Sequence, residues 1–458
     1  MSSLGLEKPN TTTATPTFLT LPNEILIKIS RNLCIHCRLL RIGEVPHEEA
    51  VTAVVQDQTA LASLSASSRQ LRAVAQPILF HFFHSLDRSY VDTRYRLCRF
   101  VCALSCRHDL TVSVRSLVLW TPDHMTPEPS PRAEELASAA LQEEEHIRQN
   151  TRAELGSWWE SHRASTVDQL QELAIALAPG VTYVLLYRKF AYRLPDPGTW
   201  SAWTYPLEGL RHLVLVGWRT GWPSESHGNS YHIQEVQAFL RCARNFESLV
   251  AADCGGDRLD ISSDWVVGRG RLKAMPWDVE LPRLKKLSIS SDNIGPEEVE
   301  AIIHNTTVFE DLELFHGGLD FGRPVLDLEM HLGTVKGTLK RLCYSAFPLT
   351  ANLELEDIYP WIIGRQDENS DDSFDPDWHQ LEGFQAGFSL KDFSVLETLE
   401  LEQLLLYGPV DEELEDAESD RTYEAVTTDE FLPKFPPSLG VTSNQTRVSG
   451  PPSRAGVL

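Results

Sequence analysis

Basic side chains are scarce in this chain of 458 residues. It has 41 lysines and arginines against 65 aspartates and glutamates, which gives a formal net charge of -24. Binding to nucleic acid or to an anionic membrane depends on clustered positive charge, so the composition argues against both partners. A neutral or basic protein partner suits the charge better. We expect no nucleic-acid and no membrane partner.

Long apolar runs and dense cysteines are also missing. No stretch approaches the roughly 20 apolar residues that cross a bilayer. The N-terminal stretch MSSLGLEKPNTTTATPT lacks the basic and apolar regions of a secretion signal. The eight cysteines are spread over the whole chain, which suits a reducing compartment better than a disulfide framework. These absences predict a cytoplasmic or nuclear protein.

No catalytic or nucleotide-binding motif is visible in the sequence, since G-x-S-x-G, the P-loop, H-E-x-x-H and a Gly-rich dinucleotide turn are all absent. Cys34 and Cys37 have the spacing of half a zinc knuckle or of a redox pair. His47 lies near them, but no second cysteine pair follows at a usual spacing, and the βαβ setting of a thioredoxin-like site is missing. The clustered acids at 410–420 are typical of a solvated surface. We predict a non-catalytic protein without a metal or cofactor.

What the chain does have, near its start, is an amphipathic pattern, LPNEILIKISRNL at 21–33. Pro22 favours a helix start, because its missing N–H would lack a partner there anyway. Ile25, Ile29 and Leu33 then form one apolar stripe, which Leu26 widens. So short a helix cannot bury this stripe alone, so its partner should lie close in the sequence.

The nearest candidate partner is TALASLSASSRQLRAVAQPILFHFFH at 59–84. Ser67 and Ser68 predict a break and a new cap between two short helices. Together with the first helix they would share a core too small to be very stable alone. We therefore expect another protein to cover part of the apolar surface.

These two stretches resemble the F-box, in the form common in fungal proteins. The family pattern is a Leu-Pro-x-Glu-(Ile/Leu) helix, then Leu-x-x-Leu-Ser-x-x-Ser-Arg-x-Leu-Arg, then Pro-x-Leu-(Phe/Tyr). One departure is the connection at 34–57, which is longer than a compact F-box needs. The residues that match are Leu21, Pro22, Glu24, Ile25, Ile29, Leu33, Leu61, Leu64, Ser68, Arg69, Leu71, Pro77, Leu79 and Phe80.

The resemblance implies a role in a ubiquitin ligase of the SCF type. The F-box would dock on a Skp-type adaptor and, through it, on a cullin, with Leu21 and Pro22 as the apolar tip that the adaptor covers. The alternative is that 21–80 simply caps the core of the next domain. The adaptor-binding residues that the resemblance implies are Leu21, Pro22, Glu24, Ile25, Leu64, Ser68, Arg69, Leu71 and Pro77.

Past residue 105 one hexamer with the pattern L-x-x-L-x-L recurs eight times. It is typical of the strand of a leucine-rich repeat, whose units stack because none can bury its own apolar face. The hexamers start 25 to 67 residues apart, which predicts degenerate repeats and an extra helix in the widest gap. They are VRSLVL at 114–119, VTYVLL at 181–186, LRHLVL at 210–215, FESLVA at 246–251, LKKLSI at 284–289, FEDLEL at 309–314, LKRLCY at 339–344 and LETLEL at 396–401.

The sequence therefore predicts an α/β protein in which a three-helix F-box is followed by an irregular leucine-rich-repeat solenoid of horseshoe form. We expect a disordered arm at 1–16 and an F-box at 17–85. A repeat domain at 100–405 would carry an acidic insert at 365–380, and an acidic, disordered tail would occupy 410–458.

The repeat pattern also predicts where a protein substrate binds. The leucines of the hexamer point into the core, so the residues between and after them face outward. Aromatic side chains on that face suit binding anchors. The alternative is that the insert around 130–165 folds over these rows and buries them. The candidate substrate-binding residues are Trp120, Tyr183, Tyr187, His212 and Phe315.

Two functions fit these patterns. The first is a substrate-recognition subunit of an SCF-type ubiquitin ligase, which would hold an unknown protein target without catalytic residues of its own. The second is a leucine-rich-repeat interaction scaffold without a ubiquitin-ligase role. Co-purification with a Skp-type adaptor and a cullin distinguishes the two.

Overall fold

A computed structural model describes the following residues of the chain: 21–39, 48–85, 90–121, 131–150, 167–188, 206–217, 236–252, 254, 277, 279–290, 296–315, 332–345 and 390–401. The predicted arm, acidic insert and tail, together with His47, lie outside these residues. The chain divides into two compact units, Met1–Phe82 and Phe83–Leu458. Each unit is described by itself.

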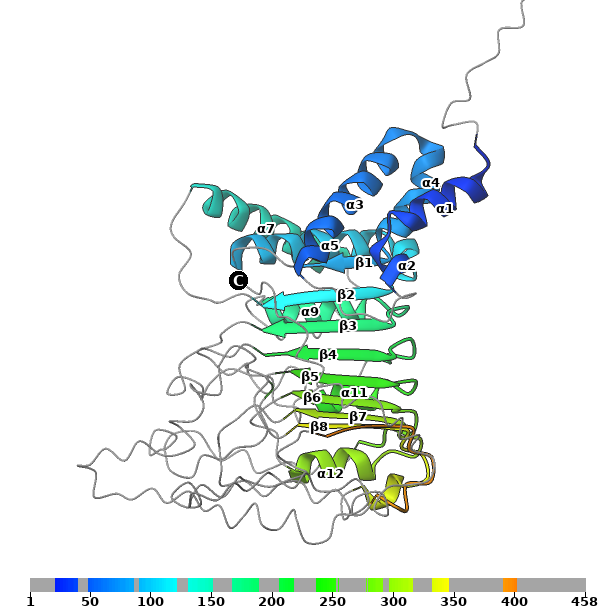
Figure 1. Cartoon of the computed structure of the whole chain (residues 1–458). Coiled ribbons are helices and arrows are strands. Elements are labelled where there is room, and N and C mark those ends of the chain that lie inside the picture. Colours follow the sequence, from blue (N-terminus) through cyan, green and yellow to red (C-terminus); the bar gives the residue numbers. More distant parts are fainter. Residues whose placement is uncertain are drawn as a thin grey trace, which may run out of the picture. The chain divides into compact units, whose positions relative to one another are not determined.

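The first unit contains four described helices, where the sequence predicts three (Figure 1). The helix α4 packs against both α1 and α3. The connection at 34–57 is not a simple loop, because it includes α2 and the first half of α3. The four helices are α1 (Asn23–Asn32), α2 (Ile35–Leu39), α3 (Glu48–Ser67) and α4 (Arg69–Leu79).

Local capping explains where α1 and α4 begin. The carbonyl of Pro22 accepts hydrogen bonds from the amides of Ile25 and Leu26, at 3.0 and 3.1 Å, so the proline stands at the N-cap of α1. The hydroxyl of Ser68 accepts the amide N–H of Leu71 at 3.1 Å. This is the cap predicted after the break at Ser67–Ser68, and that prediction is confirmed.

The apolar stripe of α1 is rotated from the one the sequence predicts. Leu26 and Ser30 are the buried residues of the helix, whereas Ile25 is 40% exposed. A small core lies between the helices, and its members come from α1, α3, α4 and the chain after α1. The buried members are Cys34, Leu61, Ala75 and Ile78, with Ile27, Leu33, Cys37, Leu64 and Leu79 packed against them.

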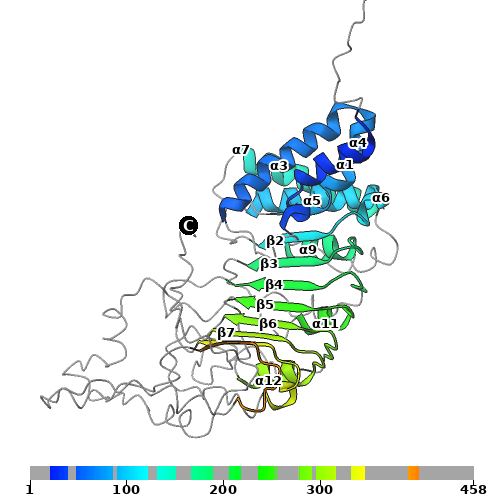
Figure 2. The same ribbon diagram turned by 45° about the vertical axis from the view of Figure 1, so that its right-hand side comes forward.

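In the described part of the chain, nine strands form one sheet in the order β1 to β9, so the fold is mixed α/β (Figure 2). All pairs from β2 to β9 are parallel. The strands are β1 (Phe82–His84), β2 (Ser116–Thr121), β3 (Tyr183–Arg188), β4 (His212–Val216), β5 (Ser248–Ala252), β6 (Lys286–Ser290), β7 (Asp311–Phe315), β8 (Arg341–Ser345) and β9 (Thr398–Leu401).

Each of the eight hexamers coincides with one strand from β2 to β9, and each strand starts at the third residue of its hexamer. In β2 to β8 the first, fourth and sixth residues of every hexamer are buried. The strand prediction is therefore confirmed, and the leucine pattern marks the face of the sheet that forms the core.

A repeated backbone contact sets the register. The carbonyl of the second hexamer residue accepts two successive amides of the next hexamer: Arg115 accepts Thr182 and Tyr183 at 2.8 and 3.1 Å. The same pair of bonds recurs at every step as far as Lys340, which accepts Glu397 and Thr398 at 2.8 and 3.0 Å. Equivalent hexamer positions are therefore neighbours across the sheet.

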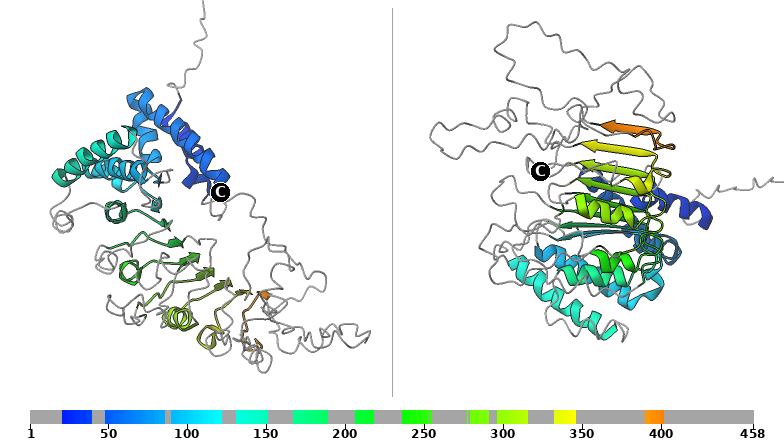
Figure 3. Two further views of the ribbon diagram at one scale, coloured as in Figure 1. Left: turned by 90° about the vertical axis from the view of Figure 1, so that its left-hand side faces the viewer. Right: turned by 90° about the horizontal axis from the view of Figure 1, so that it is seen from below.

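The helices that precede β3, β5 and β7 lie along one side of the sheet (Figure 3). The predicted extra helix is present as α7, which packs against α5. None of the described helices combines the length and the apolar character that a bilayer crossing requires. The helical elements of this unit are α5 (Tyr90–Cys106), α6 (His108–Thr111), α7 (Pro131–Asn150), α9 (Val167–Ala176), α11 (Gln237–Arg241), α12 (Pro296–His304) and the 3₁₀ turn η5 (Gly333–Val335).

Candidate interaction surfaces

The face of the sheet opposite the leucines carries three rows of side chains, from the third and fifth hexamer residues and the residue that follows the hexamer. The parallel register brings equivalent residues side by side, as in Tyr183 beside His212. In β2 to β5 these rows are largely apolar or aromatic, whereas in β6 to β9 they carry charges. The face therefore has an aromatic half and a charged half.

A stacked pair of rings dominates the aromatic half. Trp120 on β2 and Tyr187 on β3 are register partners, and their ring centroids are 4.0 Å apart at an interplanar angle of 8°. Both side chains are half-buried. The indole Nε1 of Trp120 is buried and has no hydrogen-bond partner among the described residues. A buried donor without a partner is costly, so this atom would gain from a bound acceptor.

Tyr183 and His212 are register partners at the start of β3 and β4, roughly 13 Å along the strands from the stacked pair. Burial raises the pKa of Tyr183 to about 12, and its hydroxyl finds no partner within the described part of the chain. Burial also lowers the pKa of His212, which favours the neutral ring. Phe315 does not join them, because it lies on β7 between Ser290 and Ser345. The structure thus forms two separate pairs from the predicted substrate residues, Trp120 with Tyr187 and Tyr183 with His212.

The structure describes only part of the insert that, in the alternative interpretation, covers these rows. Within 130–165, the helix α7 packs against α5, and 151–166 lie outside the described residues. Leu185 and Val214 on the same face are only 8% and 5% exposed. The exposed apolar area on the aromatic half is therefore shared between its half-buried rings and half-buried aliphatic side chains such as Val118, Val216 and Val250.

An ion-pair network occupies the charged half. The Lys286 ammonium lies 3.4 Å from a carboxylate oxygen of Asp311 and 3.0 Å from one of Glu313. Arg341 pairs with Asp311 at 3.4 Å, with Glu400 at 3.5 Å, and also with Glu313. Burial by itself would raise the pKa of Glu313, but hydrogen bonds from Lys286, Ser288 and Arg341 lower it below its usual value.

None of the charged residues of this network is among the predicted substrate-binding residues. Lys286 and Arg341 occupy the third position of hexamers on either side of the one that holds Asp311 and Glu313. Aligning the hexamers by position, as the sheet does, would have predicted these pairs. The network leaves this half of the face largely self-neutralised.

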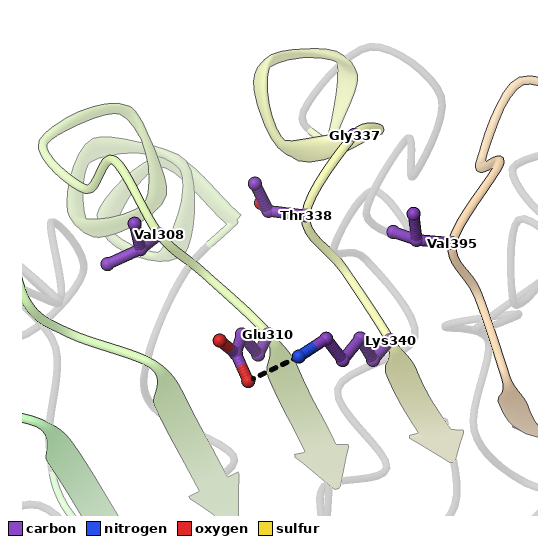
Figure 4. A pocket seen from close by; sticks show the side chains of 6 residues that line it. All are labelled: Val308, Glu310, Gly337, Thr338, Lys340 and Val395. Carbon is purple, nitrogen blue, oxygen red and sulfur yellow. Dashed lines mark hydrogen bonds and ion pairs between the residues drawn. The ribbon is translucent and has the colours of Figure 1, made fainter.

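A small pocket of about 180 Å³ lies where the chain enters β7, β8 and β9 (Figure 4). The Lys340 ammonium donates to Glu310 across it at 3.0 Å. The remaining lining comes from Val308, Gly337, Thr338 and Val395. The lining contains no nucleophile paired with a base, so the pocket gives no sign of catalysis.

The tip of α1 carries the strongest sequence prediction for the first unit. Leu21 is half-buried, and Pro22 and Glu24 are exposed. Ile25 is 40% exposed, which is unusual for a large apolar side chain in the described residues. Three apolar residues at the start of one helix therefore present surface that the unit does not cover.

The other predicted adaptor-binding residues differ in exposure. Leu71 is only 4% exposed, so it can support docking only through the packing of the unit. Arg69 is exposed, and Leu64, Ser68 and Pro77 are intermediate. An amide hydrogen bond of 3.1 Å from Gln70 to Asn23 joins α4 to the start of α1. The exposed ends of α1 and α4 are thereby held together.

A second cluster in the first unit consists of two thiols and two imidazoles. Cys34, His36, Cys37 and His81 each offer one ligand atom, and all four atoms lie within 4.8 Å of one another. The Cys37 Sγ is 3.4 Å from His81 Nδ1 and 3.8 Å from His36 Nδ1. The sequence spacing indicates the cysteine pair but neither histidine as a ligand. His36 stands between the two cysteines, whereas His81 lies 44 residues beyond Cys37 in the chain.

The two thiols have different electrostatic environments. A hydrogen bond from the Cys34 thiol, helped by His36 and His81, lowers the pKa of Cys37 to about 3. The same hydrogen bond and its burial raise the pKa of Cys34. Cys37 is thereby favoured as a thiolate next to two imidazoles.

No protein-family model matches the sequence, and neither a curated protein nor a solved structure shows significant similarity to it. The candidate surfaces therefore rest on the residues and geometry of this chain.

Proposed function

We propose that the chain is a substrate-recognition subunit of an SCF-type ubiquitin ligase. The first unit would dock a Skp-type adaptor through an F-box, and a leucine-rich-repeat solenoid would present a protein target on its sheet face. The chain would contribute no catalytic residue. The observation that carries the proposal is the uncovered apolar start of α1, which coincides with the Leu-Pro-x-Glu-Ile pattern.

Exposure at the tip of α1 supports the docking role. Leu21, Pro22 and Ile25 present apolar surface at the end of a helix whose opposite side is buried through Leu26. A unit this small gains much of its stability from what it binds. A Skp-type adaptor that covers the tip would remove that surface from water, at about 25 cal/mol per Å².

The aromatic half of the sheet face supports the target-binding role. Half-buried tryptophan and tyrosine side chains are the residues most often found as interface anchors. The Trp120 Nε1 and the Tyr183 hydroxyl are buried without a partner among the described residues, so each could donate to a target carbonyl only if the surrounding side chains move. The self-neutralised charged half would then act as the polar border of the interface.

Capture of the adaptor tests the docking role. The full chain is co-expressed with a Skp-type adaptor, and the amount captured is compared for wild type, Leu21→Ala/Pro22→Ala and Ile25→Ala. We expect a loss of at least about 2 kcal/mol of binding free energy for the double variant, because two anchors are truncated. Leu141→Ala, an exposed apolar position in the second unit, is the matched control and should bind normally.

The result separates the two candidate functions. If the wild-type chain captures neither adaptor nor cullin, the ligase role fails and the interaction scaffold without a ligase role remains. If the wild type binds but the double variant binds equally well, the contact lies elsewhere than the tip of α1. A variant that melts at the wild-type temperature and loses capture supports the proposal.

A further inference from the structure

We infer that Cys34, His36, Cys37 and His81 form a zinc site that holds the first unit together. The four side chains come from three places in the chain. Cys34 follows α1, His36 and Cys37 lie on α2, and His81 follows α4. The contact between Cys37 and His81 spans 44 residues of sequence.

The donor set fits zinc. Two thiolates and two imidazoles are the ligands of many structural zinc sites, which are tetrahedral and closed. Hard cations such as Mg²⁺ and Ca²⁺ prefer oxygen ligands, and the cluster offers none. Sulfur and nitrogen together therefore select a borderline-soft cation such as Zn²⁺.

The distances also fit. With Zn–S near 2.3 Å and Zn–N near 2.0–2.1 Å, a tetrahedral centre separates a sulfur from a nitrogen by roughly 3.5 Å. The Cys37 Sγ lies 3.4 and 3.8 Å from the two imidazole Nδ1 atoms. All four ligand atoms fall within 4.8 Å of one another, so small side-chain movements close the site.

The cluster lies at the core of the unit, with one buried and three half-buried ligand residues. Cys34 is 2% exposed and belongs to the core of the unit, and Cys37 packs against that core. The two imidazole rings meet edge to face, with centroids 5.6 Å apart. His36 Nε2 is buried without a hydrogen-bond partner among the described residues.

Zinc binding would couple to folding. Ligation converts the thiols to thiolates and releases their protons to solvent, and the site exists only when α2 and the end of α4 are together. The free energy of binding therefore adds to the stability of a unit with a small core. An alternative use of the same cysteines is a Cys34–Cys37 disulfide, which would exclude the metal.

Metal content of the purified full chain tests the inference. The chain is expressed with added zinc, purified under reducing conditions, and analysed by mass spectrometry of its metals. We expect about one zinc per chain in wild type, and at least roughly tenfold less in Cys37→Ser and His81→Ala. Cys106→Ser and His108→Ala, which remove an exposed thiol and an exposed imidazole of the second unit, should keep the metal.

Cobalt substitution provides a readout that does not depend on the folding of the variants. Wild type stripped by a chelator and titrated with Co²⁺ should show thiolate-to-cobalt absorption and the visible bands of a tetrahedral centre. Wild type that purifies without zinc and gives neither feature overturns the inference. So does a Cys34–Cys37 disulfide that persists under the reducing conditions. These measurements use the isolated chain, so their outcome is independent of whether the chain captures the adaptor.

Discussion

Trp120 and Tyr187 lie opposite each other on two parallel strands, with their rings 4.0 Å apart and nearly parallel. Neighbouring strands are about 4.8 Å apart, so the rings lean together and share a face. Such a pair contributes to folding through stacking, and its half-buried rings can also contact a partner. Stability and binding measurements on the same variants separate the two roles.

A double-mutant cycle measures the stacking contribution. We expect Trp120→Ala and Tyr187→Ala to be coupled by about 0.5–1.5 kcal/mol in the free energy of unfolding, the usual value for an aromatic pair. Denaturant unfolding of the full chain provides the measurement. Tyr187→Phe keeps the ring and should retain most of the stability, whereas additive effects of the two alanine changes would show that the rings do not stack in solution.

Gly209 is predicted to tolerate no side chain. A Cβ atom there would lie 2.8 Å from the carbonyl oxygen of Val181 and 3.0 Å from that of Pro179. Both are backbone atoms of the preceding repeat and cannot move alone. Gly209→Ala should therefore destabilise the second unit by about 1–3 kcal/mol, measured as a shift of the denaturation midpoint.

Gly333 is the matched control for this substitution. It lies in the turn η5, and a Cβ atom there would meet nothing within 4 Å. Gly333→Ala should leave stability within about 0.5 kcal/mol of wild type. Equal effects at Gly209 and Gly333 would mean that the close approach between repeats is absent.

Replacing Glu313 should lower the stability more than replacing an exposed acid that also forms an ion pair. Its side chain is 15% exposed and contacts both Lys286 and Arg341. Glu313→Gln would leave two cations with less compensation and should cost about 1–3 kcal/mol. Glu310→Gln, which breaks the exposed pair with Lys340, should cost about 0–1 kcal/mol. Thermal melting of the two variants side by side checks the order.

The pH dependence of the Glu313 contribution has a definite sign. Because the folded pKa is lowered, the stabilisation is present above the pKa of the unfolded chain and is lost as the pH falls through the folded value. Unfolding of wild type and Glu313→Gln should therefore converge in acid. A gap between them that stays constant down to low pH would contradict the role of its charge.

His84 should make the second unit sensitive to mild acid. Burial, with a smaller contribution from the charge of Arg96, lowers the pKa of His84 from 6.5 to about 4. Below pH 6.5 this histidine is protonated in the unfolded chain, whereas in the folded chain the buried ring stays neutral down to about pH 4. The free energy of unfolding should fall by about 2 kcal/mol between pH 7 and pH 5 from this group.

Replacement of the ring isolates that effect. His84→Phe removes the titrating group and should flatten the pH dependence of the melting temperature over this range. His108→Phe, at an exposed position on α6, is the control and should follow wild type. If His84→Phe keeps the full wild-type slope between pH 7 and pH 5, another group is responsible.

The strands could be predicted from the sequence because the hexamer records which side chains enter the core. Leu117 and Leu119, for example, are fully buried as the pattern requires. The start of α4 was predictable for a similar reason, since a Ser68 cap is a local contact. The helix α2 and the first half of α3 were not predicted, because no apolar periodicity in 34–57 indicates them.

The stripe of α1 and the Cys/His cluster show what the sequence could not specify. Which side of α1 is buried depends on how the helices of the unit pack, and Leu26 rather than Ile25 is the buried residue. His81 reaches Cys37 only because α3 and α4 reverse the chain. Residues that meet through tertiary packing have no fixed separation in the sequence. The usual ligand spacings of zinc sites therefore do not predict this histidine.

The pair of hydrogen bonds that each second hexamer carbonyl accepts bears on where the chain can tolerate added residues. Lys340 receives Glu397 and Thr398 in the same way that Glu310 receives Lys340 and Arg341, although far more sequence separates the first pair of strands than the second. The register of each strand pair is thus set by hydrogen bonds at the start of the strands and does not depend on how many residues separate them. In general, closing a longer connection costs little extra entropy. We therefore expect that sequence added between β8 and β9, such as an epitope or a reporter domain, leaves the order of the strands unchanged.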